Sequence, residues 1–123
     1  MKKLSLLFIF LVFTLFFVSG CSSENIGKVD VYSMESFSVI KKDSLTSYTD
    51  SKVVSNFVNA FKNAKKEQGV VDMSEPDYKV EFGEESYYLW VSEEQGTIMN
   101  INVTHTSYTL SKSSGITINE LLN

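Results

Sequence analysis

The stretch SKVVSNFVNAFKNAKKEQ, residues 51–68, carries the clearest periodic pattern in the chain. Its apolar residues recur at spacings of three and four, as the buried stripe of a surface helix requires: Val53, Val54, Phe57, Val58, Phe61 and Ala64. Asp50 lies just before this stretch, where a carboxylate can accept from the free N–H groups of the first turn. Lysines near its end and Gly69 after it favour termination there. The sequence therefore predicts a helix over about 51–68 with one face in the core.

Alternating residues after this helix predict an antiparallel meander. We expect four strands, at 78–82, 86–91, 97–103 and 106–111. A turn at 83–85 joins the first two, and an acidic loop at 92–96, with Gly96 at positive φ, joins the next two. Strand 86–91 is apolar on both faces, which indicates that both are covered. We expect its core face to carry Tyr87, Leu89 and Val91, and its other face, turned toward the last helix or solvent, to carry Tyr88 and Trp90.

Two further elements complete the predicted fold. Residues 29–40 alternate imperfectly and predict a first strand, bulged or broken near Glu35-Ser36, followed by a polar connection over 41–49. A short final helix begins at Ser113 or Ser114 and buries some of Ile116, Ile118, Leu121 and Leu122. The order β-α-β-β-β-β-α predicts an α+β fold, with an antiparallel sheet of about five strands and helices against one face.

The N-terminal residues have the layout of a secretory signal. Lys2 and Lys3 precede an almost unbroken apolar run over 4–18, shorter than the about 20 residues of a spanning helix. The residues that follow, Val18-Ser19-Gly20-Cys21, resemble the bacterial lipobox, in which the Cys thiol receives diacylglycerol before the signal is removed. We expect a signal peptide at 1–20, a lipidated tether at 21–28 and the domain at 29–123. The alternatives are an ordinary signal cut near Gly20, which leaves a free thiol, and an uncleaved anchor.

Composition limits the function of the mature part. Removal of 20 residues from the 123 leaves 103, enough for one domain with its own core. The single Cys is the lipid acceptor, so we expect no disulfide and no catalytic or metal-binding thiolate. Nine lysines, no arginine and fifteen acidic residues give this part a net charge of −6. An acidic domain of this kind is a poor partner for nucleic acid or anionic lipid headgroups.

Several short blocks of the chain form a recognisable set: Gly69-Val70-Val71-Asp72-Met73, Pro76-Asp77-Tyr78-Lys79-Val80, Tyr88-Leu89-Trp90-Val91, Gly96-Thr97-Ile98-Met99, Thr104-His105-Thr106 and Tyr108-Thr109-Leu110-Ser111. Together they resemble the YhfM-like domain of small Gram-positive lipoproteins and membrane-anchored proteins. The resemblance covers most of the mature chain and implies a place in the cell envelope. Its blocks have the character of structural elements, and it supplies no active site.

Residues with catalytic or metal-binding chemistry are few. His105 is the only histidine, and its neighbours Thr104 and Thr106 would point to the opposite face of a strand, so we expect a hydrogen-bonded sheet histidine. The pairs Glu84-Glu85 and Glu93-Glu94 fall in loops at opposite ends of one strand and do not form one carboxylate site.

Two clusters of charged residues have the composition of an ion site but lack other features of one. Asp72, Glu75 and Asp77 lack the spacing of a calcium loop, so we expect no metal and no cofactor. The lysines near the end of the predicted helix, Lys62, Lys65 and Lys66, are expected to be a solvated face rather than an anion site.

These observations favour a non-enzymatic binding or interaction module, anchored by lipid on Cys21 at the extracytoplasmic face of the cell membrane. Its partner would be an envelope protein, a wall polymer or a small molecule. The candidate binding surface comprises Tyr88, Trp90 and His105. The alternative is a small envelope enzyme, or an accessory to one, that uses His105 and nearby hydroxyl groups.

Overall fold

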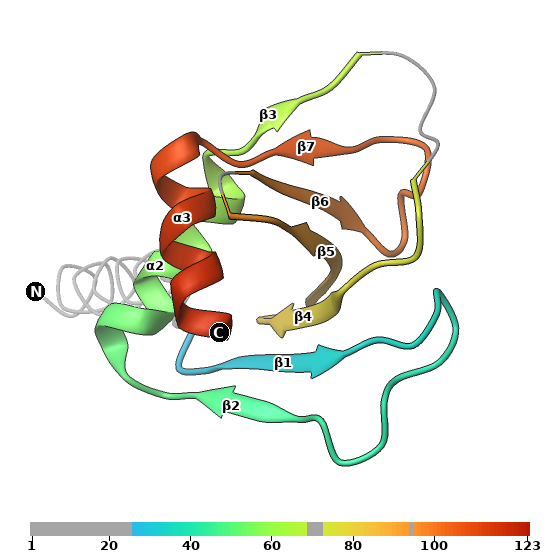
Figure 1. Cartoon of the computed structure of the whole chain (residues 1–123). Coiled ribbons are helices and arrows are strands. Elements are labelled where there is room, and N and C mark those ends of the chain that lie inside the picture. The colour runs from blue at the N-terminus through green and yellow to red at the C-terminus, as the bar shows by residue number, and fades with distance from the viewer. Residues whose placement is uncertain (1–25, 69–72, 94) are drawn as a thin grey trace, which may run out of the picture.

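The computed structural model describes residues 26–68, 73–93 and 95–123, which form one antiparallel sheet with two helices packed on it (Figure 1). The predicted α+β fold is confirmed, with seven strands in place of about five. The predicted signal peptide, 1–20, and the lipidation site Cys21 lie outside the described residues. In chain order the elements are β1 Val29–Ser33, β2 Thr46–Tyr48, α2 Ser51–Lys62, β3 Lys65–Lys66, β4 Tyr78–Phe82, β5 Glu85–Val91, β6 Gly96–Asn100, β7 Tyr108–Thr109 and α3 Lys112–Leu122.

The predicted meander forms the middle of the sheet, whose strand order is β2-β1-β4-β5-β6-β7-β3. Strands β4 and β5 make a two-residue hairpin in which Phe82 is opposite Glu85. Gly83, the first residue of that turn, has φ +61°, which suits glycine and the twist of a tight hairpin. Strand β1 pairs with the far side of β4, Asp30 opposite Glu81, so the start of β1 lies beside the end of β4.

Helix α2 begins as predicted and ends earlier. The Asp50 carboxylate accepts from the N–H groups of Lys52 and Val53 at 2.9 and 3.3 Å, which confirms the N-cap. The helix ends at Lys62, and the prediction of helix through Gln68 is wrong. Residues Lys65–Lys66 instead pair with β7, because the apolar period stops at Ala64 and leaves no buried face to hold another turn.

The segment between β1 and α2 differs from the prediction. Strand β1 ends at Ser33, and the predicted strand residues 34–40 form a loop closed by a bridge between Met34 and Ile40. The expected polar connection contains the edge strand β2, whose polar residues are tolerated because its outer side faces solvent. The Ser44 hydroxyl accepts from the Ser33 N–H at 3.1 Å and ties the loop to the strand.

The C-terminal part of the structure differs from the prediction at three points. Strands β6 and β7 are shorter than predicted, because the chain turns after Asn100, whose side-chain oxygen accepts from the Asn102 N–H. Gly96 lies in β6 without positive φ. A Cβ there would lie 2.6 Å from Leu110 Cδ1, so any larger residue needs the Leu110 side chain to shift. Helix α3 is capped by Ser111, not by Ser113 or Ser114, and buries Ile118 completely.

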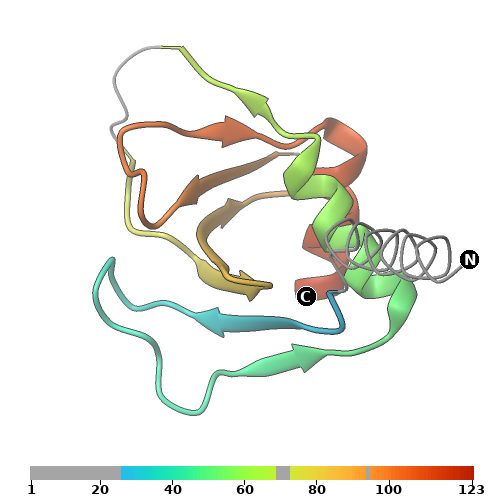
Figure 2. The ribbon, with the colours of Figure 1, turned by 180° about the vertical axis from the view of Figure 1, so that it is seen from behind.

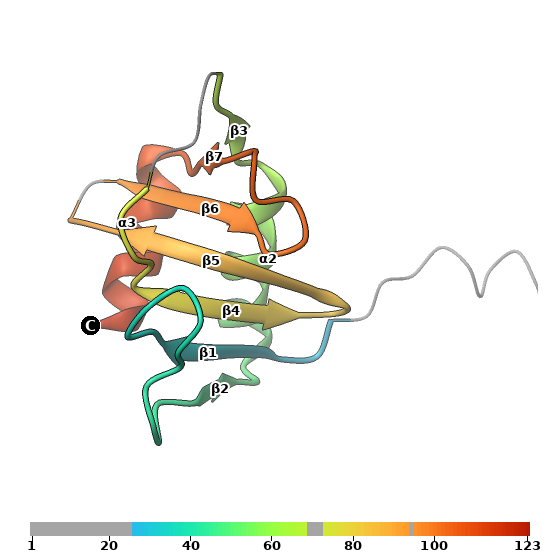
Figure 3. The ribbon, with the colours of Figure 1, turned by 90° about the vertical axis from the view of Figure 1, so that its right-hand side faces the viewer.

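Both helices cover the same face of the sheet, as Figures 1 and 2 show from opposite sides. The core between the two layers contains fully buried Phe57 from α2, Leu89 from β5, Ile98 from β6 and Ile118 from α3. Gly115 allows this approach, since a Cβ there would lie 3.2 Å from the Gly96 backbone nitrogen. Figure 3 shows the other face, where the β1–β2 loop and the segment before β4 lie in front of the sheet. Among the described residues no helix has the length and apolar character to cross a membrane.

Candidate binding pocket

Tyr88 and Trp90 do face away from the main core, as predicted, but this candidate binding surface is largely covered. Trp90 is only 8% exposed, and its indole N–H donates to the Ser74 carbonyl at 2.8 Å. Phe37, from the β1–β2 loop, places its ring 5.4 Å from Tyr88 and 6.1 Å from Trp90. The cover is therefore made by two loops rather than by the last helix or by solvent. A binding role for Tyr88 and Trp90 stays a prediction; the most exposed ring on this face is that of Phe37, at 38%.

The structure does not join His105 to these aromatic residues. His105 is exposed in the turn between β6 and β7, so the expected sheet histidine is wrong. Within the described part of the chain, His105 belongs to no strand, and its imidazole forms no hydrogen bond and no ion pair with a carboxylate. The candidate surface of Tyr88, Trp90 and His105 is thus an aromatic cluster and a separate exposed histidine.

The acidic residues considered as carboxylate or calcium ligands have separate structural surroundings. The Asp77 carboxylate accepts from the Val91 N–H at 3.0 Å and holds the start of β4 against the end of β5. Asp72 and Glu94 lie outside the described residues. In the described part of the chain, no three His, Cys, Asp or Glu side chains gather into a group able to hold a metal ion.

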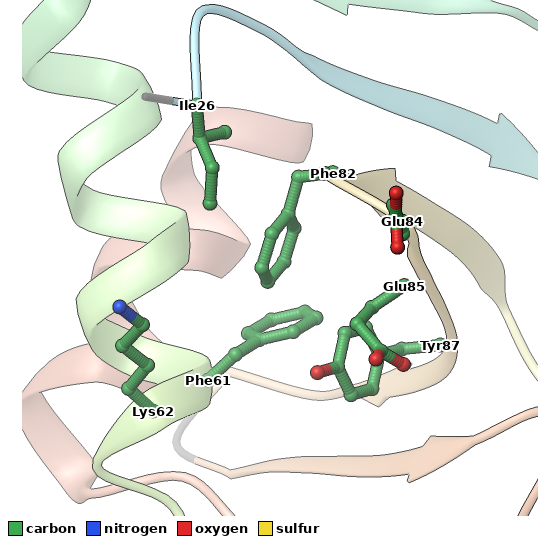
Figure 4. Close-up of a pocket in the computed structure, with 8 residues that line it drawn as sticks. Ile26, Phe61, Lys62, Phe82, Glu84, Glu85 and Tyr87 are labelled. Atoms are coloured by element: carbon green, nitrogen blue, oxygen red, sulfur yellow. The ribbon is translucent and has the colours of Figure 1, made fainter. Parts of the chain in front are cut away.

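A cavity of about 460 Å³ lies at the end of the sheet where the described chain begins (Figure 4). Four structural units supply its walls: the segment before β1, the last turn of α2, the β4–β5 turn and the strands beside it. The lining residues are Ile26, Phe61, Lys62, Phe82, Gly83, Glu84, Glu85 and Tyr87. Its volume falls within the range of about 300–1,000 Å³ typical of small-molecule sites.

Three aromatic rings form the apolar wall of this cavity. The rings of Phe82 and Tyr87 stack with centroids 5.4 Å apart, and Phe61 meets Tyr87 edge-on at 5.1 Å. Phe61 and Phe82 are almost fully buried, whereas Tyr87 is half-buried. Because each ring contacts the other two, the wall is already assembled in the absence of a ligand.

Charged groups lie on two sides of the opening. Glu84 and Glu85 are exposed at the hairpin turn, and the Glu85 carboxylate accepts from the Asn100 side-chain amide at 2.7 Å. Lys62 comes from α2 on the opposite side, and in Figure 4 its side chain extends along the helix, away from both glutamates. The pocket therefore combines an apolar wall with a rim of mixed charge.

Sequence reasoning assigned Tyr87 to the core and Glu84-Glu85 to a turn, and it did not find the pocket. Phe82 and Tyr87 are recognisable from the sequence as aromatics on neighbouring strands, which can pair across a hairpin. Nothing in the pattern indicates that the last turn of α2 stops beside that hairpin and leaves a cavity.

The family model described as YhfM protein matches residues 24–123, which include every helix and strand of the fold. Searches of curated proteins and of solved structures gave no match. The match extends over far more than half of the chain and fits the blocks noted in the sequence. The chain belongs to the YhfM protein family.

Proposed function

We propose that this chain is an extracytoplasmic binding module held at the cell membrane by lipid on Cys21. The observation that carries the binding role is the preformed aromatic pocket of Phe61, Phe82 and Tyr87. Its size suits a small molecule or one unit of a polymer better than a protein surface, which is usually flatter. Support for a catalytic alternative through His105 is weaker, because that imidazole is exposed in a turn and does not line the pocket.

The proposed anchor places the pocket close to the bilayer. Ile26, which lines the pocket, is five positions after Cys21, and five residues span at most about 18 Å when fully extended. Two acyl chains hold a protein stably on a membrane, whereas one chain holds it marginally. The ligand would therefore meet the domain near the outer membrane surface.

The anchor is tested by metabolic acyl labelling of cells that express the full chain or its Cys21→Ala variant. We expect label on the parent and none on the variant, with the variant accumulating in the uncleaved form. Continued labelling of Cys21→Ala would contradict the anchor.

The binding role is tested by photo-crosslinking from the pocket rim in intact cells. A photoreactive amino acid replaces Glu84, and in a matched control it replaces Glu120, an exposed carboxylate on α3. We expect an adduct specific to position 84. Identical products from the two positions, or none from either, would argue against the pocket as the binding site.

A further inference from the structure

The pocket has chemical features that narrow the class of its ligand. Its apolar wall consists of the rings of Phe61, Phe82 and Tyr87, with the aliphatic side chain of Ile26 beside them. Such a wall binds an apolar body by removing it from water. Tyr87 is half-buried and is the most exposed of the three rings.

The rim on the hairpin side accepts hydrogen bonds and carries negative charge. Glu84 and Glu85 are consecutive in the turn and both line the cavity. One oxygen of Glu85 is fixed by the Asn100 amide, which orients the carboxylate and leaves its second oxygen for another donor. Ionised carboxylates only accept hydrogen bonds, so a ligand group that meets them must donate or carry positive charge.

Among the described residues that line the cavity, Lys62 is the basic one, and it belongs to the opposite wall. Its ammonium group lies on the α2 side in Figure 4, with the aromatic wall between it and the glutamates. The two sides of the opening therefore differ in charge, and the hairpin side is where a cation is favoured. The net negative charge of the domain favours the approach of a cation as well.

We propose that the pocket binds an organic cation, in which a primary or quaternary amine is joined to an apolar body. The body lies against the three rings, and the cationic group lies between the Tyr87 ring and the carboxylates of Glu84 and Glu85. Aromatic faces and carboxylates both attract organic cations. This inference rests on the proposed binding role of the pocket and adds the class of ligand.

The test uses three soluble probes that share one phenyl body: phenethyltrimethylammonium, 3-phenylpropanol and 3-phenylpropionate. Each is titrated into the full lipidated chain in phosphatidylglycerol nanodiscs, and amide shifts of Gly83, Glu84 and Glu85 give the dissociation constant. We expect the cation to bind about tenfold or more tightly than the alcohol, and the carboxylate probe to bind most weakly.

A double variant, Glu84→Gln with Glu85→Gln, isolates the contribution of the rim. It keeps an acceptor for the Asn100 amide and should reduce the preference for the cation to about two- to fivefold, the part that the Tyr87 ring supplies. Unchanged binding of the alcohol shows that the pocket is intact. Glu120→Gln removes the same kind of charge from α3 and should leave the preference for the cation unchanged.

The outcomes separate the ligand class from the binding role. Equal or tighter binding of the alcohol or the carboxylate probe at the pocket would overturn the organic cation and leave the binding role standing. A preference for the cation that is as large in the double variant as in the parent would also overturn the assignment to the glutamates. Absence of pocket shifts with all three probes would overturn both the ligand class and the proposed pocket function.

Discussion

Replacement of Phe57 by Ala tests the packing of helix on sheet more directly than any other single change. Phe57 is at the centre of α2, is 0% exposed, and has the rings of Tyr48 and Phe61 at 5.4 and 6.4 Å. Burial of a Phe side chain contributes about 1.5–3 kcal/mol to stability. The neighbouring rings belong to different elements and cannot collapse freely into the space, so a cavity adds to the loss. The free energy of unfolding should fall by about 3–5 kcal/mol.

The measurement is urea unfolding followed by circular dichroism, on a soluble chain that begins at residue 22. All the residues of the core cluster lie within this chain. For a domain of this size, the loss corresponds to a fall in Tm of at least about 12 °C. Phe37→Ala makes the same chemical change at a residue 38% exposed and should cost less than half as much. Equal losses at both positions, or a change within about 0.5 kcal/mol at Phe57, would refute the packing described here.

Three further predictions follow from individual contacts. Trp90→Ala should lower the free energy of unfolding by about 3 kcal/mol. Trp90→Phe mainly loses the hydrogen bond to Ser74 and should cost about 1 kcal/mol. An unchanged Tm for Trp90→Ala would contradict the burial of this side chain and indicate an exposed aromatic surface. Gly96→Ala should cost about 1–3 kcal/mol, because its Cβ meets Leu110, and Leu110→Val should recover part of that loss in the double variant; additive losses would contradict the close contact. Burial, with a smaller contribution from Tyr78, raises the pKa of the Tyr48 hydroxyl above its usual value of 10.0. The stability that the neutral hydroxyl contributes is therefore complete below pH 10.0 and is lost as the pH rises through the folded-state pKa. Urea midpoints at increasing pH above 10.0 should therefore fall less for Tyr48→Phe than for the parent, and parallel curves would contradict the shift.

The elements predicted correctly are those whose pattern is local. The period of α2, the cap at Asp50 and the alternation in β4 and β5 each occupy a few consecutive residues, and each matches the structure. The strands missed by the sequence, β2 and β3, are short and polar. They exist because a partner strand elsewhere in the chain satisfies their backbone groups, as β7 does for Lys65 and Lys66. Edge strands of this kind carry no hydrophobic signal.

The candidate site was harder to predict, because it too depends on contacts between segments that lie far apart in the sequence. Two apolar faces on β5 correctly indicated that Tyr88 and Trp90 are covered or central, but the cover comes from Phe37 and Ser74 in loops with no periodic pattern. The pocket requires the end of α2 to lie beside the β4–β5 hairpin, with Ile26 across from it. This arrangement depends on where α2 stops, and the sequence placed that end six residues too late.

In the proposed arrangement, lipid on Cys21 holds the domain at the membrane. The aromatic pocket then lies at the end of the domain that faces the membrane. Register supports this geometry within the domain, because the start of β1 and the β4–β5 turn lie at the same end of the sheet, whereas the β1–β2 loop lies at the other (Figure 3). The decisive measurement is paramagnetic broadening of amide signals by gadolinium-labelled lipid, for the full chain in nanodiscs.

We expect Gly83 and Glu84 to broaden strongly and Asp43, in the β1–β2 loop, to stay sharp. Release of the domain from the disc, or stronger broadening of Asp43 than of Gly83, would contradict the account.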